Sequence, residues 1–158
     1  MLFSKSFGYA LRGLLYIATC QKPGQPVQVD AIAGELGVPR FFMAKILKGL
    51  VKDGFLHSVK GPRGGFSLPP ATRERALIDL LAAIDGTGLL HNCVLRLGAC
   101  NAANPCPMHR YFTRIQGDVQ ATLEDTRLSD LLLPERAELL RSLSPESVAQ
   151  PNPSSNLN

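Results

Sequence analysis

The sequence lacks any uninterrupted apolar run of the length that a membrane-spanning helix needs, about 18 residues or more. Met1–Cys20 is amphipathic, but Lys5 and Arg12 interrupt its apolar residues, and it has no clear small-residue cleavage site. We therefore expect a cytoplasmic protein with no membrane partner, in which this first segment is a helix rather than a signal peptide.

Charged residues are also few. They make up 19% of the chain, whereas apolar residues make up 45%. This balance permits a hydrophobic core and excludes a disordered polyelectrolyte. The length of 158 residues suits one compact domain with an extended arm better than two full domains.

Motifs of the common enzyme classes are missing. The glycine-rich segment at 61–65 lacks the Gly-Lys-Ser/Thr ending and the following helix of a phosphate-binding loop. The chain has no dinucleotide-binding fingerprint, no Ser/His/Asp motif and no recognisable pair of carboxylates. We therefore predict that it is not an enzyme.

Positive charge, by contrast, is concentrated in the first part of the chain. Residues 1–70 hold nine Lys or Arg against three Asp or Glu, a net charge of +6, and residues 71–158 hold eight against ten, a net charge of −2. A basic head on a nearly neutral support is typical of a protein that binds a polyanion such as DNA. An ordinary solvated surface is the alternative that charge alone leaves open.

The basic part contains the pattern of a helix-turn-helix. Helical spacing predicts a first helix over Ser6–Thr19, and a short helix follows Asp30, which is a good N-cap. Residues 37–39 form a tight Gly-Val-Pro turn, and apolar residues then repeat at helical spacing from Arg40 to Asp53. A short helix, a glycine-containing turn and a longer helix are typical of this DNA-binding motif.

A basic hairpin is predicted to follow it. Phe55–Val59 and Phe66–Leu68 have the character of two strands, and the glycine-rich segment between them supplies the tip. Lys60 and Arg63 flank this tip, and Arg63 can enter the narrow minor groove of a duplex. A helix-turn-helix with such a hairpin is a winged helix.

The remaining residues predict a support for this head. Arg73–Ile84 is expected to be one helix, and residues 86–107 form a long irregular loop. After Pro107, a helix carries an apolar stripe that is expected to pack against a second subunit: Tyr111, Phe112, Ile115, Val119 and Leu123. A last helical fragment is expected over Leu128–Leu143.

The predicted fold class is therefore mainly α with a small β-hairpin, a winged helix-turn-helix joined to a long C-terminal dimerisation helix. We expect residues 1–70 to form the DNA-binding domain and residues 71–107 the connecting helix and the cysteine loop. Residues 108–143 would form the dimerisation helix and a short C-terminal helix, and residues 144–158 a disordered tail.

The second helix of the motif should read DNA, because it enters the major groove with its N-terminal residues first. The candidate contacts that its apolar stripe does not use are Arg40, Phe41, Lys45 and Lys48. Arg40 and Lys45 can reach base edges or phosphates, and Lys48 is better placed for the backbone. Phe41 can press on a thymine methyl group or pack in the core. A merely solvated helix face is the alternative for the whole set.

Three of the four cysteines, Cys93, Cys100 and Cys106, crowd into the irregular loop, whereas Cys20 is expected to be a small core residue. Their spacings match neither a C-x2-C zinc ribbon nor a thioredoxin-type pair. His109 shares a helical face with Cys106 if the last helix begins near that cysteine. Three sulfurs and one nitrogen suit a structural zinc or an iron–sulfur cluster with one unusual ligand. A thiol switch and plain structural cysteines are further alternatives.

Several segments together resemble one family. Ser4-Lys5-Ser6 with Tyr9-Ala10-Leu11-Arg12 is similar to the opening of the IscR/NsrR regulators, the Rrf2 family of bacterial transcription factors. Ile32-Ala33 and Leu36-Gly37-Val38-Pro39 resemble its helix-turn-helix. The most specific match is Ser58-Val59-Lys60-Gly61-Pro62-Arg63-Gly64-Gly65-Phe66, which is similar to its wing. The resemblance covers about residues 2–132.

Family members with three loop cysteines hold a two-iron two-sulfur or four-iron four-sulfur cluster and dimerise through the long last helix. The resemblance therefore implies that Cys93, Cys100 and Cys106 are cluster ligands, and His109 matches the histidine that completes the IscR site. The first cysteine spacing is one residue longer than in IscR. Gly8 stands where some NsrR-type proteins have an acidic ligand, which favours His109 or an exogenous ligand.

The resulting hypothesis is a homodimeric transcription regulator, a repressor, that binds a palindrome in double-stranded promoter DNA. Its affinity would be switched by a cluster that senses redox, nitric oxide or iron status and that is easily lost in an aerobic preparation. The alternative is a cluster-free winged-helix regulator or adaptor, with a zinc or thiol-switch cysteine loop.

Overall fold

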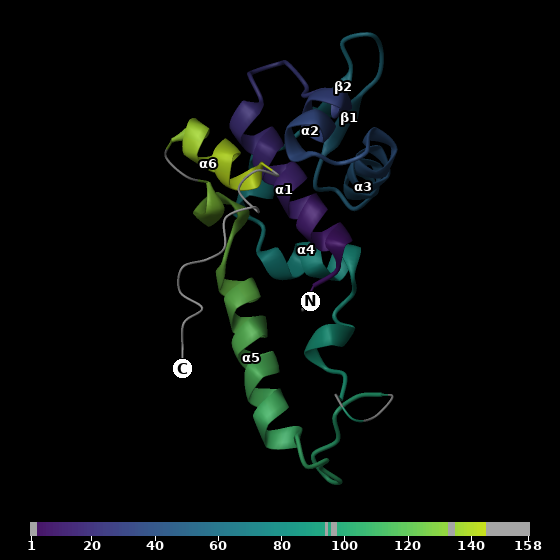
Figure 1. Cartoon of the computed structure of the whole chain (residues 1–158), viewed down its shortest axis with the longest axis vertical. Coiled ribbons are helices and arrows are strands. Elements are labelled where there is room, and N and C mark those ends of the chain that lie inside the picture. Colours follow the sequence, from purple (N-terminus) through teal and green to yellow (C-terminus); the bar gives the residue numbers. More distant parts are fainter. Residues whose placement is uncertain (1–2, 94, 96–97, 133–134, 145–158) are drawn as a thin grey trace.

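The protein consists of a helical head and a stem that extends away from it (Figure 1). The computed structural model describes residues 3–93, 95, 98–132 and 135–144. It confirms the predicted fold class, since the described residues are mainly helical with one two-stranded antiparallel hairpin. The predicted tail lies outside the described residues except for Ser144. No helix in the described part of the chain is both long and apolar enough to cross a membrane.

The chain forms the head first, then the stem, and finally returns to the head. The head contains the helices α1 (Lys5–Cys20), α2 (Val29–Leu36) and α3 (Arg40–Lys52), the strands β1 (His57–Val59) and β2 (Gly65–Ser67), the 3-10 turn η1 (Pro70–Glu74) and α4 (Leu77–Ile84). The stem contains η2 (Gly88–Leu90) and α5 (His109–Asp125), and η3 (Leu128–Leu131) and α6 (Arg136–Leu143) return to the head.

Helix α1 is the centre of the head because most of its surface is covered by other helices. It contacts α2, α3, α4 and α6, and Ala10, Leu14 and Ile17 are almost completely buried. Its first turn is capped by Ser4, whose hydroxyl accepts a hydrogen bond from the Phe7 N–H at 3.0 Å. Such a cap contributes about 1 kcal/mol to helix stability.

The turn between α2 and α3 has the predicted position. Gly37 ends α2 with φ 60° and ψ 35°, a left-handed conformation that favours glycine. The N–H of Val38 then bonds to the carbonyl oxygen of Ala33, which closes the turn. The start of α2 differs from the prediction, since the helix begins at Val29 and its N-cap is Gln28. Asp30 is therefore a first-turn residue and not the cap.

The hairpin is shorter than predicted but has the expected antiparallel pairing, with Ser58 opposite Phe66. Phe66 also exchanges two backbone hydrogen bonds with Val27, each 2.8 Å long, so the hairpin is fixed to the segment before α2. A Cβ atom at Gly64 would lie 2.3 Å from the carbonyl oxygen of Val59, which means that the tip requires glycine at this position.

The prediction of one helix over 73–84 was wrong. Residues 70–74 form η1, and α4 begins only at Leu77. The reason is a tertiary contact: Ala76 pairs with Arg127 in an isolated bridge, and the Leu77 N–H bonds to the Thr126 carbonyl oxygen at 2.9 Å. This pairing holds Arg75 and Ala76 in an extended conformation, which no local periodicity reveals.

Residues 86–107, hereafter the cysteine loop, run down from α4, and α5 runs back up beside them to the head (Figure 1). The wing and the cysteine loop thus lie at opposite ends of the long axis of the molecule. Helix α6 then packs on α1, with Leu139 and Leu143 buried in the core. The Arg12 guanidinium donates hydrogen bonds to the carbonyl oxygens of Leu36 and Leu143, at the ends of α2 and α6.

Candidate DNA-binding groove and cysteine loop

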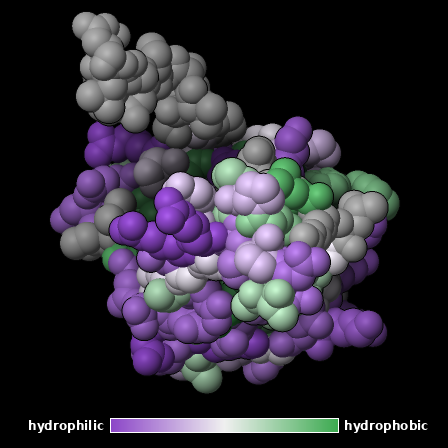
Figure 2. All heavy atoms as spheres, turned by 90° about the horizontal axis from the view of Figure 1, so that it is seen from below, coloured by the Kyte–Doolittle hydropathy of each residue, from purple (hydrophilic) through white to green (hydrophobic). Residues whose placement is uncertain are grey.

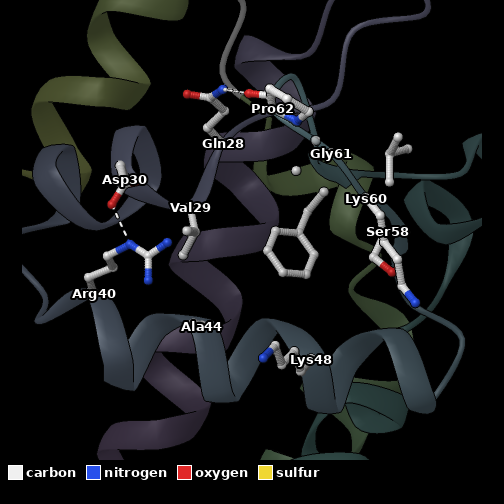
Figure 3. Close-up of a pocket in the computed structure, with 14 residues that line it drawn as sticks. Gln28, Val29, Asp30, Arg40, Ala44, Lys48, Ser58, Lys60, Gly61 and Pro62 are labelled. Atoms are coloured by element: carbon white, nitrogen blue, oxygen red, sulfur yellow. Dashed lines mark hydrogen bonds and ion pairs between the residues drawn. The ribbon is translucent and has the colours of Figure 1, made fainter.

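A groove of about 580 Å³ lies between α3, the start of α2 and the wing (Figure 3). Three basic side chains line it, those of Arg40, Lys48 and Lys60. Asp30 is the one carboxylate among the groove-lining residues of the described chain. The Gln28 side-chain amide donates to the Pro62 carbonyl oxygen at 3.4 Å, which joins one wall of the groove to the wing.

Arg40, the first residue of α3, is held at the mouth of this groove by an ion pair. Its Nε atom lies 2.5 Å from Oδ1 of Asp30, and both side chains are 65% exposed. Because the pair is so exposed, it contributes less than about 1 kcal/mol to stability. The main effect of the ion pair is to hold the Arg40 guanidinium at the mouth of the groove.

Phe41 and Phe42 have opposite environments although they are adjacent. Phe42 is half-buried, and its ring meets that of Tyr9 edge-on, with centroids 5.6 Å apart. Phe41 is 81% exposed, so core packing does not account for it. An aromatic side chain this exposed at the leading end of α3 is available for contact with a ligand.

The other predicted DNA contacts are exposed cations. Lys45, Lys48, Lys60 and Arg63 are all exposed, the first two on α3 and the others in the wing. Over the described ranges the ion pairs are Arg40 with Asp30 and Arg75 with Asp79, so no carboxylate neutralises these four cations there. The surface can therefore attract phosphates, and its attraction should weaken with salt.

Two described segments of the cysteine loop, residues 91–93 and 98–100, pair with each other. Asn92 pairs with Ala99, the Cys93 N–H donates to the Gly98 carbonyl oxygen at 2.8 Å, and the Cys100 N–H donates to the His91 carbonyl oxygen at 3.0 Å. This ladder places the backbones of Cys93 and Cys100 on two paired legs. None of the four cysteines is joined in a disulfide.

The sulfur of Cys93 lies 3.6 Å from that of Cys106. Two thiolates on one tetrahedral metal with bonds of about 2.3 Å stand about 3.8 Å apart, so this pair fits two adjacent ligand positions. Within the described residues no third Cys, His, Asp or Glu completes a metal-binding group. Cys93, Cys100 and Cys106 thus lie in one loop, His109 begins the helix that follows it, and the sulfurs of Cys93 and Cys106 are adjacent.

His109 is the first residue of α5, and its N–H donates to the Cys106 carbonyl oxygen at 2.9 Å. The helix therefore begins three residues after Cys106, and the expectation of a shared helical face does not hold. Cys106 instead lies in the turn that leads into α5. His109 is half-buried at the start of this helix.

Sequence reasoning missed one polar residue of the stem, Gln116. It is only 8% exposed, and its side-chain amide donates to the carbonyl oxygens of Leu89 at 3.0 Å and Asn92 at 2.9 Å. The sequence did contain a signal for this buried position. Gln116 lies four residues after Phe112 and three before Val119, on the apolar face of α5. A polar residue there needs buried partners.

The apolar stripe of α5 is divided between two neighbouring faces. Leu123 is buried, and Phe112 and Val119 are half-buried against the rest of the chain. Tyr111 and Ile115, on the other face, are 52% and 49% exposed. Viewed from the stem end, the surface carries apolar patches between polar ones (Figure 2).

Comparison with known proteins gives one consistent answer. The family model Rrf2, described as an iron-dependent transcriptional regulator, matches residues 3–134. A protein of Aquifex aeolicus assigned as an HTH-type transcriptional regulator is 33% identical over 141 residues, which cover 88% of this chain and 96% of that protein. The regulator IscR of Pectobacterium carotovorum is 26% identical over 124 residues, covering 78% of this chain and 74% of IscR.

Solved structures support the same fold. CymR, the global cysteine regulator of B. subtilis, is similar with a TM-score of 0.65 at 19% identity, over 82% of this chain and 94% of CymR. The structure of T. potens IscR is similar with a TM-score of 0.61 at 18% identity, over 94% of this chain and 92% of that one. At these identities the likeness shows the winged-helix fold alone.

Proposed function

The chain belongs to the Rrf2 family of transcriptional regulators, and from this premise we propose that it is a homodimeric repressor of promoter DNA whose affinity is switched at the cysteine loop. The family and the named relatives are regulators rather than enzymes, in agreement with the missing catalytic motifs. The single observation that carries the proposal is the basic groove between α3 and the wing.

The groove supports a division of work between two elements. The leading end of α3 carries Arg40, Phe41 and Lys45, which would face base edges in the major groove. The wing carries Lys60 and Arg63 on an exposed tip, which would reach phosphates or the minor groove. Two such heads on a two-fold dimer would read the two halves of a palindrome.

The exposed apolar side chains of α5 support dimerisation through the stem. Tyr111 and Ile115 lie on a helix whose other apolar face is already covered by the same chain. A second copy of α5 would remove them from water, and two-fold symmetry would place the same residues on both sides of the interface.

The switch proposed for the loop is an iron–sulfur cluster held by Cys93, Cys100 and Cys106, with His109 as the fourth ligand that the family resemblance implies. When bound, such a cluster supplies a redox-sensitive centre. The grouped sulfurs of Cys93 and Cys106 support two of these ligand positions. Cys100 lies on the leg of the loop whose backbone pairs with the leg of Cys93, since its N–H donates to the carbonyl oxygen of His91.

The packing of the stem offers a route from the loop to the groove. Gln116 bonds to the loop backbone, α5 contacts α4, α4 contacts α1, and α1 contacts α3. A change in the cysteine loop would therefore shift a chain of packed helices that ends at the DNA-reading helix. We propose that ligation acts by altering the spacing of the two heads.

The DNA-binding part is tested by electrophoretic mobility shifts over a range of salt concentrations. Duplex binding should weaken with salt, and Lys48→Ala should reduce the slope of log K against log salt by about one. Glu124→Ala, a change of charge on the stem far from the groove, is the control that should leave the slope unchanged. Binding that is absent or insensitive to salt would contradict the proposal.

The cluster is tested by absorbance, iron and sulfide analysis of protein purified without oxygen. Cys100→Ala should abolish the chromophore, whereas Cys20→Ala, at the end of α1, should retain it. A colourless wild type would contradict the proposed cluster. A normal cluster spectrum in Cys100→Ala would contradict Cys100 as a ligand. Neither result would affect the proposed DNA binding.

The 3.6 Å separation of Cys93 and Cys106 favours a thiol switch as the second candidate. In this reaction the two thiols lose two protons and two electrons and one sulfur–sulfur bond forms. Hydrogen peroxide takes up these protons and electrons, its oxygen–oxygen bond breaks, and two molecules of water leave. Treatment of metal-free protein with hydrogen peroxide should then yield a disulfide between the peptides that contain Cys93 and Cys106, detected by mass spectrometry. Oxidation that leaves both as separate sulfinic acids would contradict this candidate.

A further inference from the structure

The ion pair at the mouth of the groove has a specific geometry. Oδ1 of Asp30 is paired with Nε of Arg40, the inner nitrogen of the guanidinium, and not with either terminal nitrogen. Figure 3 shows both terminal nitrogens directed away from Asp30. The carboxylate therefore orients the guanidinium through Nε and leaves the two terminal nitrogens, Nη1 and Nη2, available to a ligand.

The free end of Arg40 keeps its donor capacity. An arginine side chain has five N–H donors, and Nε accounts for one of them. Within the described residues no other group accepts a hydrogen bond from Arg40. The terminal nitrogens can thus donate two parallel hydrogen bonds to one planar acceptor pair.

The presence of Asp30 distinguishes between the two targets that a groove arginine can have. An exposed carboxylate beside the guanidinium repels phosphate and lowers the net charge of the site, which does not favour a backbone contact. A base edge carries no net charge, and O6 and N7 of guanine match the fork of an arginine. The fork must be oriented for this contact, and the Nε pair orients it.

We propose that Asp30 is a positioning residue that aims Arg40 at a guanine in the major groove and so sets part of the sequence specificity. The inference rests on the proposed DNA binding and concerns neither the cluster nor the dimer. It assigns a role to a residue whose position, in the first turn of α2, otherwise suggests only a favourable interaction with the helix dipole.

A merely structural role for Asp30 predicts different behaviour. Loss of a first-turn carboxylate would lower stability by a small amount and would affect all DNA sequences equally. A positioning role instead changes the ratio of specific to non-specific affinity. Arg40→Lys provides a second probe, because lysine keeps the charge but lacks the planar fork.

The chain offers a matched control in Asp79. This residue lies in the first turn of α4, and its Oδ2 is 3.5 Å from Nε of Arg75, so it repeats the arrangement of Asp30 and Arg40 away from the groove. Asp79→Asn therefore reproduces the loss of charge and of an ion pair at residues that do not line the groove. Arg75 has further partners in the Asp53 carbonyl oxygen, at the C-terminal end of α3, and in the Phe55 ring, so its position does not depend on Asp79 alone.

The experiment uses full-length protein and a duplex that the wild type selects from a randomised pool. Affinities for this duplex and for a scrambled duplex of equal composition are measured for wild type, Asp30→Asn, Arg40→Lys and Asp79→Asn, with thermal unfolding as the check on folding. Arg40→Lys should lower the specific-to-scrambled ratio about tenfold, within the range for one bidentate contact. Asp30→Asn should lower it about threefold, because it removes only the exposed ion pair that orients the fork and leaves the fork itself in place. Asp79→Asn should leave the ratio unchanged. Replacement of the guanine that Arg40 contacts by another base should remove the effect of Asp30→Asn.

Two results would overturn the inference while duplex selection by the wild type still succeeds. One is an unchanged ratio in Asp30→Asn, and the other is an equal loss of affinity for both duplexes. If the wild type selects no duplex at all, the proposed function itself fails and the inference falls with it. These outcomes are therefore distinguishable.

Discussion

The side-chain Nε2 atom of Gln116 lies 2.9 Å from the carbonyl oxygen of Asn92, so α5 is bonded directly to the residue that precedes Cys93. A second bond from the same amide reaches Leu89 at 3.0 Å. These two hydrogen bonds attach the cysteine loop to α5. The first leg of the loop is bonded to the helix that we propose as the dimer interface, so a rearrangement of residues 89–92 acts on that helix.

Replacement of Gln116 by alanine should release this leg of the loop. Two carbonyl oxygens lose a part-buried hydrogen-bond partner, which should cost about 1–2 kcal/mol of unfolding free energy. Backbone amides of residues 88–93 should exchange faster with deuterium, whereas those of α1 should not change. The measurements are urea unfolding and hydrogen exchange followed by mass spectrometry.

Gln120→Ala is the matched control for this change. Gln120 lies one turn later on α5 and bonds to Glu124 at the surface of the same helix, at 2.7 Å. Its loss should leave exchange in the cysteine loop unaltered. Equal exchange rates in Gln116→Ala and Gln120→Ala would refute a role for Gln116 in holding the loop.

How much of this molecule its sequence predicts depends on the range of the interactions involved. The helix-turn-helix was predictable because its signals are local: helical periodicity from Arg40 onward, and a glycine at position 37 that adopts φ 60°. The start of α4 could not be predicted in this way, because Arg127, which is distant in the sequence, pairs with Ala76 and keeps it extended. Propensity within a short window carries no information about such a partner.

In the candidate site, too, local features could be predicted from the sequence and long-range contacts could not. The cations of α3 and the wing were predicted as DNA contacts from their spacing, and the structure shows that they are exposed. The ion pair of Asp30 with Arg40 was missed because each residue had a satisfactory local explanation, one as an N-cap and the other as a DNA contact. Likewise, residue types nominated Cys93, Cys100 and Cys106 together as ligands but could not show that the sulfurs of Cys93 and Cys106 are adjacent, because that depends on the pairing of residues 91–93 with 98–100.

Gly64 provides a second prediction, on the geometry of the wing. Gly64→Ala should displace the tip, because its Cβ would lie 2.3 Å from the Val59 carbonyl oxygen. We expect a loss of roughly 1–3 kcal/mol in stability, as in other cases of forced overpacking, and weaker DNA binding. Gly34→Ala should instead stabilise the protein by about 0.5–1 kcal/mol, since α2 has open space around that glycine. Similar unfolding midpoints for the two variants in thermal denaturation would contradict the account of the tip.

A third prediction concerns the exposed face of α5. Ile115→Asp should weaken dimerisation roughly 100-fold or more, because an unpaired charge would be buried in the interface. The fold of the monomer should survive, since the side chain is 49% exposed in the single chain. Sedimentation equilibrium gives the dimer constant. Ala121→Asp adds the same charge to an exposed position on another face of α5 and should leave the dimer intact; dimers of equal strength in both variants would place the interface elsewhere.

Phe41 and Phe42 form a natural pair for the last prediction, since one is exposed and the other packs against Tyr9. Phe42→Ala should lower the unfolding free energy by about 2–3 kcal/mol, less than for a fully buried ring. Phe41→Ala should leave stability nearly unchanged but weaken binding to the selected duplex about fivefold, a cost within the range for one mismatched base pair.

The target of Phe41 can be tested on the DNA side as well, because uracil differs from thymine only by the methyl group that the ring would contact. Uracil is substituted at each thymine of the selected duplex in turn, and affinities are measured for wild type and Phe41→Ala. At one position per half-site the two losses should not add, since both remove the same contact. Additive losses at every thymine would mean that Phe41 does not read a methyl group, and its exposure would then need another partner.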